Sequence, residues 1–340
     1  MQQATFPSEF RQIIIFGAGA VGCYVGGRLA AQGLPVCLVG RPTALEPVAQ
    51  QGLKVTDLDG CAQHVPPSAL RLAHSLAQAA PTVGSLILLC VKSGGTEAAA
   101  REMAAVCAPG TSVLSLQNGV DNADRIRTAA PALHALAGMV PYNLVLRGAH
   151  VHRATSGVLH LERDVVTEGL APLLHAAGLP AVLSADIRAV QWGKLLLNLN
   201  NPVNALSDLP LREELLDRDH RRVLAALQTE ALGAMARAGI RPARLTAVPP
   251  ALLPHVLRLP DALFTRLARR MLQIDAQARS SMWDDLEAGR LTEIDALCGA
   301  VVRLAHAHGV AAPLNARMVE LLNGPRLRCS GWQLRAELGV

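Results

Sequence analysis

The 340-residue sequence predicts an α/β domain with a doubly wound, mainly parallel sheet, followed by an all-α domain. Three observations support this prediction. A β-branched run leads into a glycine-rich turn near the start, two later apolar runs end in polar residues, and long amphipathic patterns begin at about residue 187. The chain is also longer than a single hydrophobic core usually serves. We therefore expect two domains, over residues 1–185 and 186–340.

The first forty residues hold a strand, a glycine turn, a helix and a second strand, in that order. Residues 12–16 form a short β-branched run that continues directly into Gly17-Ala18-Gly19-Ala20-Val21-Gly22. Residues 23–32 are predicted to form a helix that ends at Gly33, and residues 35–39 are predicted to form the next strand. This order is typical of a Rossmann unit that binds a dinucleotide.

Each glycine of this motif has a distinct role in such a unit. Gly17 permits the tight turn, Gly19 lets the backbone approach a pyrophosphate, and Gly22 lets the helix pack on the strand. The phosphates would lie at the helix N-terminus, where free N–H groups and the helix dipole favour anions. We therefore predict that all six residues of the motif contribute to a cofactor site.

The end of the second strand indicates which dinucleotide binds. A site for NAD has an acidic residue about 20 residues after the motif, where it binds the ribose 2′-hydroxyl. This chain has Val39-Gly40-Arg41-Pro42 there, without a carboxylate. Arg41 is placed to bind a 2′-phosphate through two parallel hydrogen bonds, which favours NADP over NAD. The alternative is an ordinary loop arginine.

Two further predicted strands end in polar side chains. Residues 85–91 are followed by Lys92, and residues 111–116 are followed by Gln117-Asn118-Gly119. Because ligands of open parallel sheets bind outside the carboxyl ends of the strands, we predict that Lys92 and Asn118 contact a cofactor or substrate. Asn118-Gly119 could equally be a plain turn. Residues 135–145 and 156–161 are predicted to be further strands that complete the domain.

Lys194 is the most informative residue of the second half. Only three of the 32 basic residues are lysines, and Lys194 lies in an apolar stretch that holds amides and no other charge. In a helix over residues 187–206, Asn198 and Asn201 would share its face, and Pro202 should kink that helix. Burial should lower the pKa of such a lysine, which suits a proton donor. The alternative is a polar seam that joins two domains.

The remaining pattern predicts two more helices. Residues 258–287 are expected to form a long helix that ends at Gly289. Thr292 is expected to cap the next helix, which Glu293 opens and which runs to His308 before Gly309. Taken by itself, Glu293 is most simply explained as a first-turn carboxylate favoured by the helix dipole.

Composition argues against several classes of protein. The net charge of +5 would suit nucleic-acid binding, but the arginines are scattered and aromatics make up only 3%. The seven cysteines form no pair or Cys/His cluster with zinc spacing, so we expect free thiols and no metal. Residues 1–12 lack the apolar core of a signal peptide, and the longest apolar run, residues 86–91, is too short to cross a bilayer. We therefore expect a cytoplasmic protein with neither a nucleic-acid nor a membrane partner.

Together these features resemble the ketopantoate reductases (2-dehydropantoate 2-reductases), NADPH-dependent enzymes of pantothenate synthesis. The resemblance extends from about residue 12 to residue 320. Besides the glycine motif, the matching segments are Gln117-Asn118-Gly119, Trp192-Gly193-Lys194-Leu195 with Asn198, Ser280-Ser281-Met282, and Thr292-Glu293-Ile294-Asp295. The family pairs a Rossmann domain with a helical domain, and its active site lies in the cleft between them. The resemblance therefore implies an NADP-binding domain over 1–185 and a substrate and catalytic domain over 186–340.

The resemblance also implies roles for individual residues. The family's general acid falls on Lys194 and its substrate-side carboxylate on Glu293, which makes these the predicted catalytic residues. The substrate-binding serine falls on Ser281. The amides that contact cofactor and substrate fall on Asn118 and Asn198.

Two residues of this chain match family positions that contact the cofactor, and two other positions differ from the family pattern. Arg41 and Lys92 match positions associated with the 2′-phosphate side of NADP. Gly95 stands where the family often has a glutamine, and Pro202 stands where a second helix asparagine is common. Asn201 is then the expected substitute on the substrate side.

The implied reaction is hydride transfer from NADPH to the ketone carbon of a 2-oxo acid, with Lys194 protonating the oxygen. Reduction of ketopantoate to pantoate is the expected case. One alternative is a reductase of the same fold for a different 2-oxo or 3-hydroxy acid. Another is a non-catalytic regulator that binds NADP. The expected partner is a small-molecule 2-oxo acid, and a homodimer is kept as one alternative for the assembly.

Overall fold

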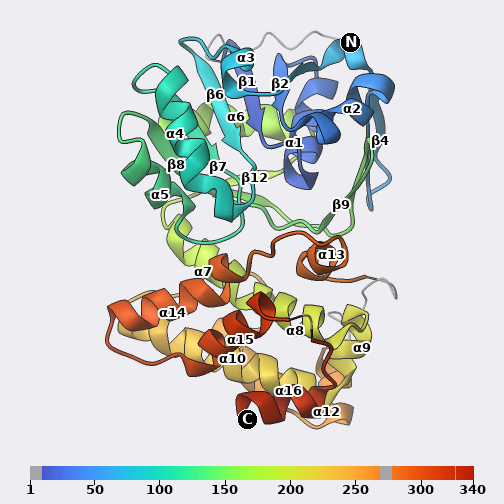
Figure 1. Ribbon diagram of the computed structural model, residues 1–340, viewed down its shortest axis with the longest axis vertical. Coiled ribbons are helices and arrows are strands. Elements are labelled where there is room, and N and C mark those ends of the chain that lie inside the picture. Colours follow the sequence, from blue (N-terminus) through green and yellow to red (C-terminus); the bar gives the residue numbers. More distant parts are fainter. Residues whose placement is uncertain (1–9, 269–277, 326) are drawn as a thin grey trace. The chain divides into compact units, whose positions relative to one another are not determined.

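The computed structural model describes residues 10–268, 278–325 and 327–340. The chain divides into two compact units, Met1–Ile187 and Arg188–Val340. Within the described residues all strands belong to the first unit, and the second unit is built from helices (Figure 1). The prediction of an α/β domain followed by an all-α domain is therefore confirmed.

The larger sheet of the first unit has eight strands in the order β12-β11-β8-β7-β6-β1-β2-β5. The neighbouring strands β8, β7, β6, β1, β2 and β5 all run parallel, and β11 pairs antiparallel with β8. The chain order reverses at β1, which lies between β2 and β6, and ligands of such sheets bind at this point. The strand bounds are β1 Gln12–Phe16, β2 Val36–Val39, β5 Arg71–Ala73, β6 Ser85–Leu89, β7 Ser112–Ser115, β8 His134–Met139, β11 Leu159–Glu162 and β12 Ala181–Ser184.

Helices cover both faces of this sheet, as the apolar residues of β1 require. Ile13 and Ile15 pack with side chains of α1, α2 and α6, whereas Ile14 and Phe16 pack with those of α3, α4 and α5. All four residues are buried, which explains the continuous apolar run of a central parallel strand. The helix bounds are α1 Ala20–Ala31, α2 Pro42–Gln51, α3 Leu76–Ala79, α4 Thr96–Val106, α5 Asn122–Ala129 and α6 Val165–Ala176.

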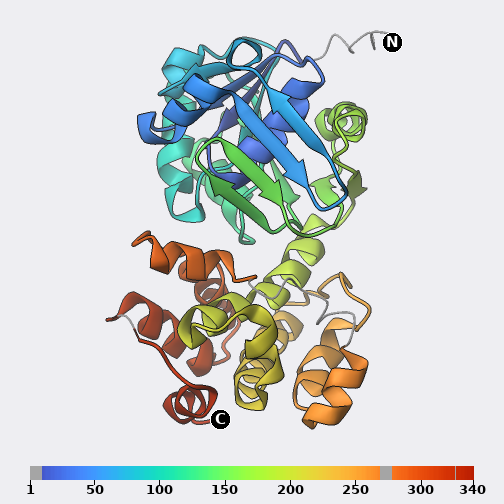
Figure 2. The ribbon, with the colours of Figure 1, turned by 90° about the vertical axis from the view of Figure 1, so that its right-hand side faces the viewer.

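A second, smaller sheet was not predicted. Its order is β4-β3-β10-β9, with β3 Leu53–Asp57, β4 Ala62–Val65, β9 Leu144–Arg147 and β10 His150–Arg153. Figure 2 shows the blue β3 and β4 beside the green β9 and β10. The sheet packs on α1 at Gly27, where an added Cβ would lie 2.6 Å from the Val55 side chain.

The predicted strand over residues 135–145 is wrong as a single element. β8 ends at Met139 in the large sheet, and β9 begins at Leu144 in the small one. Pro141 lies between them and has no backbone N–H to continue a ladder, which accounts for the change of sheet.

The second unit is organised around α10, a helix of 20 residues. Helices α8, α9, α11, α14, α15 and α16 pack against it. The helix bounds are α7 Ile187–Asn198, α8 Asn200–Ser207, α9 Leu211–Leu216, α10 Arg218–Arg237, α11 Leu253–Leu257, α12 Asp261–Leu267, α13 Ser281–Glu287, α14 Cys298–Ala307, α15 Pro313–Asn323 and α16 Gly331–Leu338. Short 3₁₀ helices are η1 Pro67–Ala69, η2 Ser93–Gly95, η3 Pro250–Leu252 and η4 Ile294–Ala296.

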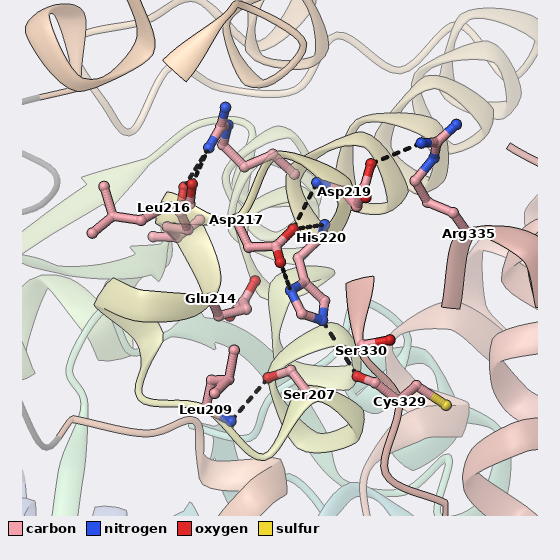
Figure 3. A network of polar contacts seen from close by, with 12 residues as sticks. Ser207, Leu209, Glu214, Leu216, Asp217, Asp219, His220, Cys329, Ser330 and Arg335 are labelled. Atoms are coloured by element: carbon pink, nitrogen blue, oxygen red, sulfur yellow. Dashed lines mark hydrogen bonds and ion pairs between the residues drawn. The ribbon is translucent and has the colours of Figure 1, made fainter. Parts of the chain in front are cut away.

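Polar contacts at the start of α10 fasten the C-terminal segment (Figure 3). Asp217 caps the helix, because its Oδ1 accepts hydrogen bonds from the backbone N–H groups of Asp219 (2.7 Å) and His220 (3.2 Å). Arg335 of α16 donates to Asp219 at 2.7 Å. The buried His220 ring contacts the carbonyl oxygen of Cys329 at 3.5 Å.

The long helix predicted over residues 258–287 is wrong. Pro260 precedes α12, and the side chain of Ser280 caps α13. A proline has no N–H for a helical hydrogen bond and disfavours helical geometry at the residue before it, so Pro260 favours a break at this point. Residues 269–277 of the predicted helix lie outside the described residues.

The other two helix predictions also need correction. The helix predicted over residues 187–206 is two helices divided at Leu199, one turn before Pro202, so the predicted kink is present as a break. The missing N–H of Pro202 leaves the Asn198 carbonyl without a helical partner. The helix predicted to begin at Glu293 is instead η4 followed by α14, and Thr292 does not cap it. Leu297, with φ −105° and ψ −90°, breaks the helical path between the two. Gly309 does follow the end of α14, with φ +67°.

Candidate active site

The glycine motif forms the loop after β1 and lies against the loop after β6. Gly17 has φ +119°, and an added Cβ would lie 2.6 Å from the backbone of Cys90 and Val91. At Gly22 an added Cβ would lie 2.0 Å from the carbonyl oxygen of Gly17. The fold itself therefore requires glycine at both positions, in the turn and in the helix that packs on β1.

Gly19 differs from the other two glycines. It is exposed, its φ of −88° suits any residue, and an added Cβ would meet nothing within 4 Å. The protein therefore gives no internal reason for glycine here, whereas a ligand approaching the backbone would. Gly19 is also the N-cap of α1 and offers no side-chain cap, which leaves the first-turn N–H groups available for an anion.

Arg41 lies directly after β2 at the same edge of the sheet. Gly40, before it, comes so near the glycine motif that an added Cβ would lie 2.7 Å from the Ala18 Cβ. Arg41 is exposed, and its guanidinium makes no hydrogen bond or ion pair with the described part of the chain. The side chain is thus available to a ligand beside the glycine motif, while its predicted contact with a 2′-phosphate stays a prediction.

The loops after β6 and β7 are joined by hydrogen bonds. Ser93 Oγ donates to the carbonyl oxygen of Asn118 at 2.5 Å, and Gln117 Nε2 donates to the Val91 carbonyl at 3.0 Å. These bonds bring the half-buried Asn118 and the exposed Lys92 to the carboxyl edge of the sheet, where the sequence placed them. Gln117 is buried and serves the fold, since its amide is bonded inside the protein.

In the second unit, Lys194 lies on α7 in a tightly packed turn. Trp192 is buried, and an added Cβ at Gly193 would lie 2.5 Å from the Ala243 carbonyl oxygen. The Lys194 residue is half-buried, and desolvation lowers the pKa of its amine to about 8. The prediction of a lysine with a lowered pKa agrees with this environment.

The amides and the serine of the second unit come from three helices. Asn198 ends α7, and Asn201 belongs to α8 because of the division at Leu199, so the two do not continue one helical stripe. Both are half-buried. Ser281 is the exposed first residue of α13, which packs on α8.

Glu293 is the half-buried N-cap residue of η4. The 3₁₀ turn η4 packs on α14 and α15, and α15 in turn contacts α8. Its predicted role as a carboxylate on the substrate side stays a prediction, as do the roles of Asn198, Asn201 and Ser281.

Two groups that sequence reasoning missed are Glu214 and the capping role of Ser280. Glu214 is fully buried, yet the run Leu211–Leu216 does not distinguish it from the exposed Glu213. Within the described residues, no group of three or more His, Cys, Asp or Glu side chains is suited to a metal ion. All seven cysteines are free. The described helices include none with the length and hydropathy needed to span a bilayer.

Comparison with protein families covers both units. Residues 13–164 match the family described as ketopantoate reductase PanE/ApbA, and residues 186–326 match its C-terminal counterpart, ketopantoate reductase PanE/ApbA C terminal. The chain belongs to the ketopantoate reductase family. The predicted resemblance is therefore confirmed at the level of the family, whose members are oxidoreductases.

Individual relatives of this ketopantoate reductase family member are distant in sequence but nearly as long. The 2-dehydropantoate 2-reductase of Halobacterium salinarum is 29% identical over 92% of this chain and 97% of its own. That of Archaeoglobus fulgidus is 28% identical over the same shares. A solved PanE/ApbA family ketopantoate reductase from Ralstonia eutropha is 30% identical with a TM-score of 0.78, again over 92% and 97%.

A second solved structure shows the fold alone. D-mandelate dehydrogenase with NADH and anilino(oxo)acetate is 22% identical with a TM-score of 0.73, covering 97% of this chain and 100% of its own. The fold of the ketopantoate reductase family is thus shared with a dehydrogenase of a different name, and the fold does not decide the substrate.

Two alanine substitutions in the glycine motif should affect different properties, one the binding of the cofactor and the other the stability of the fold. Gly19→Ala is expected to change the free energy of unfolding by no more than about 1 kcal/mol, because the Cβ meets no atom. It should weaken binding of a nicotinamide dinucleotide such as NADPH, since the methyl group would intrude on the ligand. Gly22→Ala should cost about 3 kcal/mol or more, because its Cβ would overlap backbone. Urea unfolding and fluorescence titration with NADPH measure both effects.

Gly233→Ala on α10 is the matched control, since its Cβ would also meet nothing within 4 Å. It should leave NADPH affinity at the wild-type value and raise stability by about 0.5–1 kcal/mol, the usual gain from alanine inside an exposed helix. A Gly19→Ala variant that binds NADPH as tightly as the wild type would contradict the assignment of the glycine motif to the pyrophosphate.

Proposed function

We propose that the chain is an NADPH-dependent reductase that converts 2-dehydropantoate (ketopantoate) to pantoate in pantothenate biosynthesis. The observation that supports this most is Lys194, an amine whose pKa burial lowers to about 8, at the position of the general acid in this family's motif. Membership of the ketopantoate reductase family, with both its domains matched, supports the same reaction.

The first unit suits NADPH. Gly19 leaves room for a pyrophosphate at the start of α1, and Arg41 presents a guanidinium at the end of β2, where an NAD site would have a carboxylate. Lys92 and Asn118 lie on neighbouring loops of the same edge. Bound NADPH would supply the hydride that reduces the ketone carbon.

The second unit would supply the proton and hold the substrate. Lys194 Nζ would donate a proton to the ketone oxygen as negative charge develops on it, and would regain one from solvent afterwards. Glu293 would hydrogen-bond the substrate hydroxyl or hold Lys194 in place. Ser281 and the amides of Asn198 and Asn201 would grip and orient the acid.

The rate of the proposed reaction should depend on pH through Lys194. A proton donor acts only while protonated, so kcat/KM for the 2-oxo acid should be constant below the lysine pKa. It should fall about tenfold per pH unit above a midpoint near 8. Initial rates from pH 6 to 10 measure this profile, and a kcat/KM that rises through pH 8 would contradict a lysine acid.

A panel of substrates separates the proposed function from its alternatives. NADPH oxidation should be fastest with ketopantoate, compared at equal concentration with other 2-oxo acids. A clear preference for another 2-oxo acid, or oxidation of a 3-hydroxy acid, would favour the same-fold reductase. NADPH binding without turnover of any acid would favour a regulator.

The assembly and the location stay predictions. A solved ketopantoate reductase from Staphylococcus aureus, 18% identical with a TM-score of 0.69, is described as dimeric. That likeness supports the fold only, so a homodimer of this chain is a proposal that sedimentation can test. The cytoplasmic location is likewise proposed from the sequence.

A further inference from the structure

Glu214 is a carboxyl group with 0% exposure in the second unit. It lies on α9, the short helix that leads into α10 (Figure 3). Its Oε2 accepts hydrogen bonds from Asn200 Nδ2 at 3.1 Å and from Asn204 Nδ2 at 3.2 Å. Both asparagines belong to α8, so one buried acid holds the helix that also carries Asn201.

Asn204 extends this contact to α13. Its Nδ2 also donates to the Leu209 carbonyl at 2.9 Å, and its Oδ1 accepts from the backbone N–H of Ser280 at 2.8 Å. Because both ends of the amide are bonded, its orientation is fixed. Ser280 in turn caps α13 by accepting from the N–H of Trp283 at 3.1 Å.

The three residues that precede Ser281 are all tied to the segment 204–211. Such consecutive bonds leave the start of α13 little freedom to move relative to α8. The bonds run from Leu211 N to Ala278 O (2.9 Å), from Arg279 Nη1 to Asp208 O (2.6 Å), and from Ser280 N to Asn204 Oδ1 (2.8 Å).

Burial favours the protonated form of the Glu214 carboxyl. Burial raises its pKa to about 8, although the hydrogen bonds from Asn200 and Asn204 lower the pKa by a smaller amount. Its Oε1 finds no hydrogen-bond partner among the described residues, and an ionised carboxylate in that setting would be costly. A neutral side chain that still accepts two hydrogen bonds should therefore replace it well.

We propose that Glu214 is a positioning residue for the substrate side of the site. Through Asn200 it fixes the start of α8, which carries Asn201. Through Asn204 it fixes the start of α13, which carries Ser281. The inference rests on the proposed function, which assigns Asn201 and Ser281 to the substrate.

Two variants at this position test the inference. Glu214→Leu removes the oxygen that accepts from both asparagine amides. Glu214→Gln is neutral and keeps an amide oxygen that can accept both hydrogen bonds. The KM for ketopantoate should rise about tenfold in Glu214→Leu and stay within about twofold of the wild type in Glu214→Gln. The kcat and the Kd for NADPH should change little in either, because these bonds involve neither Lys194 nor a residue of the first unit.

Amide hydrogen exchange gives a readout that does not need activity. Peptides covering residues 278–283 should exchange faster in Glu214→Leu, because Ser280 N–H loses its fixed acceptor, and at the wild-type rate in Glu214→Gln. If Glu214→Leu does not fold, Asn204→Ala tests the same link, since it removes the acceptor of Ser280 N–H directly. It should show the same rise in KM and in exchange.

Three results would overturn the inference: an unchanged KM in a folded Glu214→Leu or Asn204→Ala variant, an equal rise in the Kd for NADPH, or failure of Glu214→Gln to restore KM. A lower melting temperature with normal KM would show that Glu214 serves stability alone. A wild-type chain that reduces no 2-oxo acid would instead refute the proposed function. The exchange rates would then still decide whether Glu214 fixes the start of α13.

Discussion

Replacing Lys194 with alanine is expected to lower kcat for ketopantoate reduction by about 10²- to 10⁴-fold, the range that a general acid contributes. The Kd for NADPH should stay within about twofold of the wild type, since the cofactor motif belongs to the first unit. Steady-state rates and fluorescence titration measure the two quantities. Lys54→Ala is the matched control, because Lys54 is an exposed lysine of β3 with no proposed role.

Lys194→Arg separates proton donation from positive charge. An arginine keeps the charge but its pKa lies too high for it to release a proton, so this variant should be nearly as slow as Lys194→Ala. Recovery of kcat in Lys194→Arg would mean that charge alone is required. Loss of NADPH binding with intact kcat would remove Lys194 from the chemistry altogether.

The second large effect concerns the choice of cofactor. Arg41→Ala should raise the KM for NADPH about 10- to 100-fold, because a charge-assisted hydrogen-bonded pair with the 2′-phosphate is lost. The KM for NADH, which lacks that phosphate, should hardly change. Rates with each cofactor at saturating ketopantoate measure the ratio.

Arg11→Ala controls for the loss of an exposed arginine from the same unit. Arg11 directly precedes β1 and therefore lies at the opposite edge of the sheet from the glycine motif. Its removal should leave the preference between NADPH and NADH unchanged. Equal effects of Arg41→Ala on the two cofactors would refute the 2′-phosphate role.

The α/β half was predictable because most of its signals are local. The apolar run over Gln12–Phe16 needs two covered faces, and the close contact of Gly22 is with the backbone of Gly17 in the same motif. The polar residues at the strand ends also followed from the strand pattern alone. In these cases the pattern of apolar residues along the sequence matches the pattern of buried residues in the strand.

What the sequence did not reveal depends on contacts between distant segments. The smaller sheet pairs β3 with β10 across almost a hundred residues, and short strands of mixed polarity carry no strong periodic signal. Glu214 is buried where α9 packs against α8 and α10, and no local pattern marks a buried acid. The kink predicted at Pro202 is present as the division at Leu199, whereas the break at Pro260 was not predicted, because one missing N–H there outweighs an otherwise helical pattern.

The most direct measurement is the stoichiometry of the reaction with purified wild-type protein. NADPH oxidation and pantoate formation are followed together after ketopantoate is added, with a sample lacking the acid as background. We predict one pantoate formed for each NADPH consumed, at a rate that Lys194→Ala reduces by at least about 100-fold. Tight NADPH binding with no consumption above background, for ketopantoate and every other 2-oxo acid tried, would contradict the assignment of this chain as a reductase.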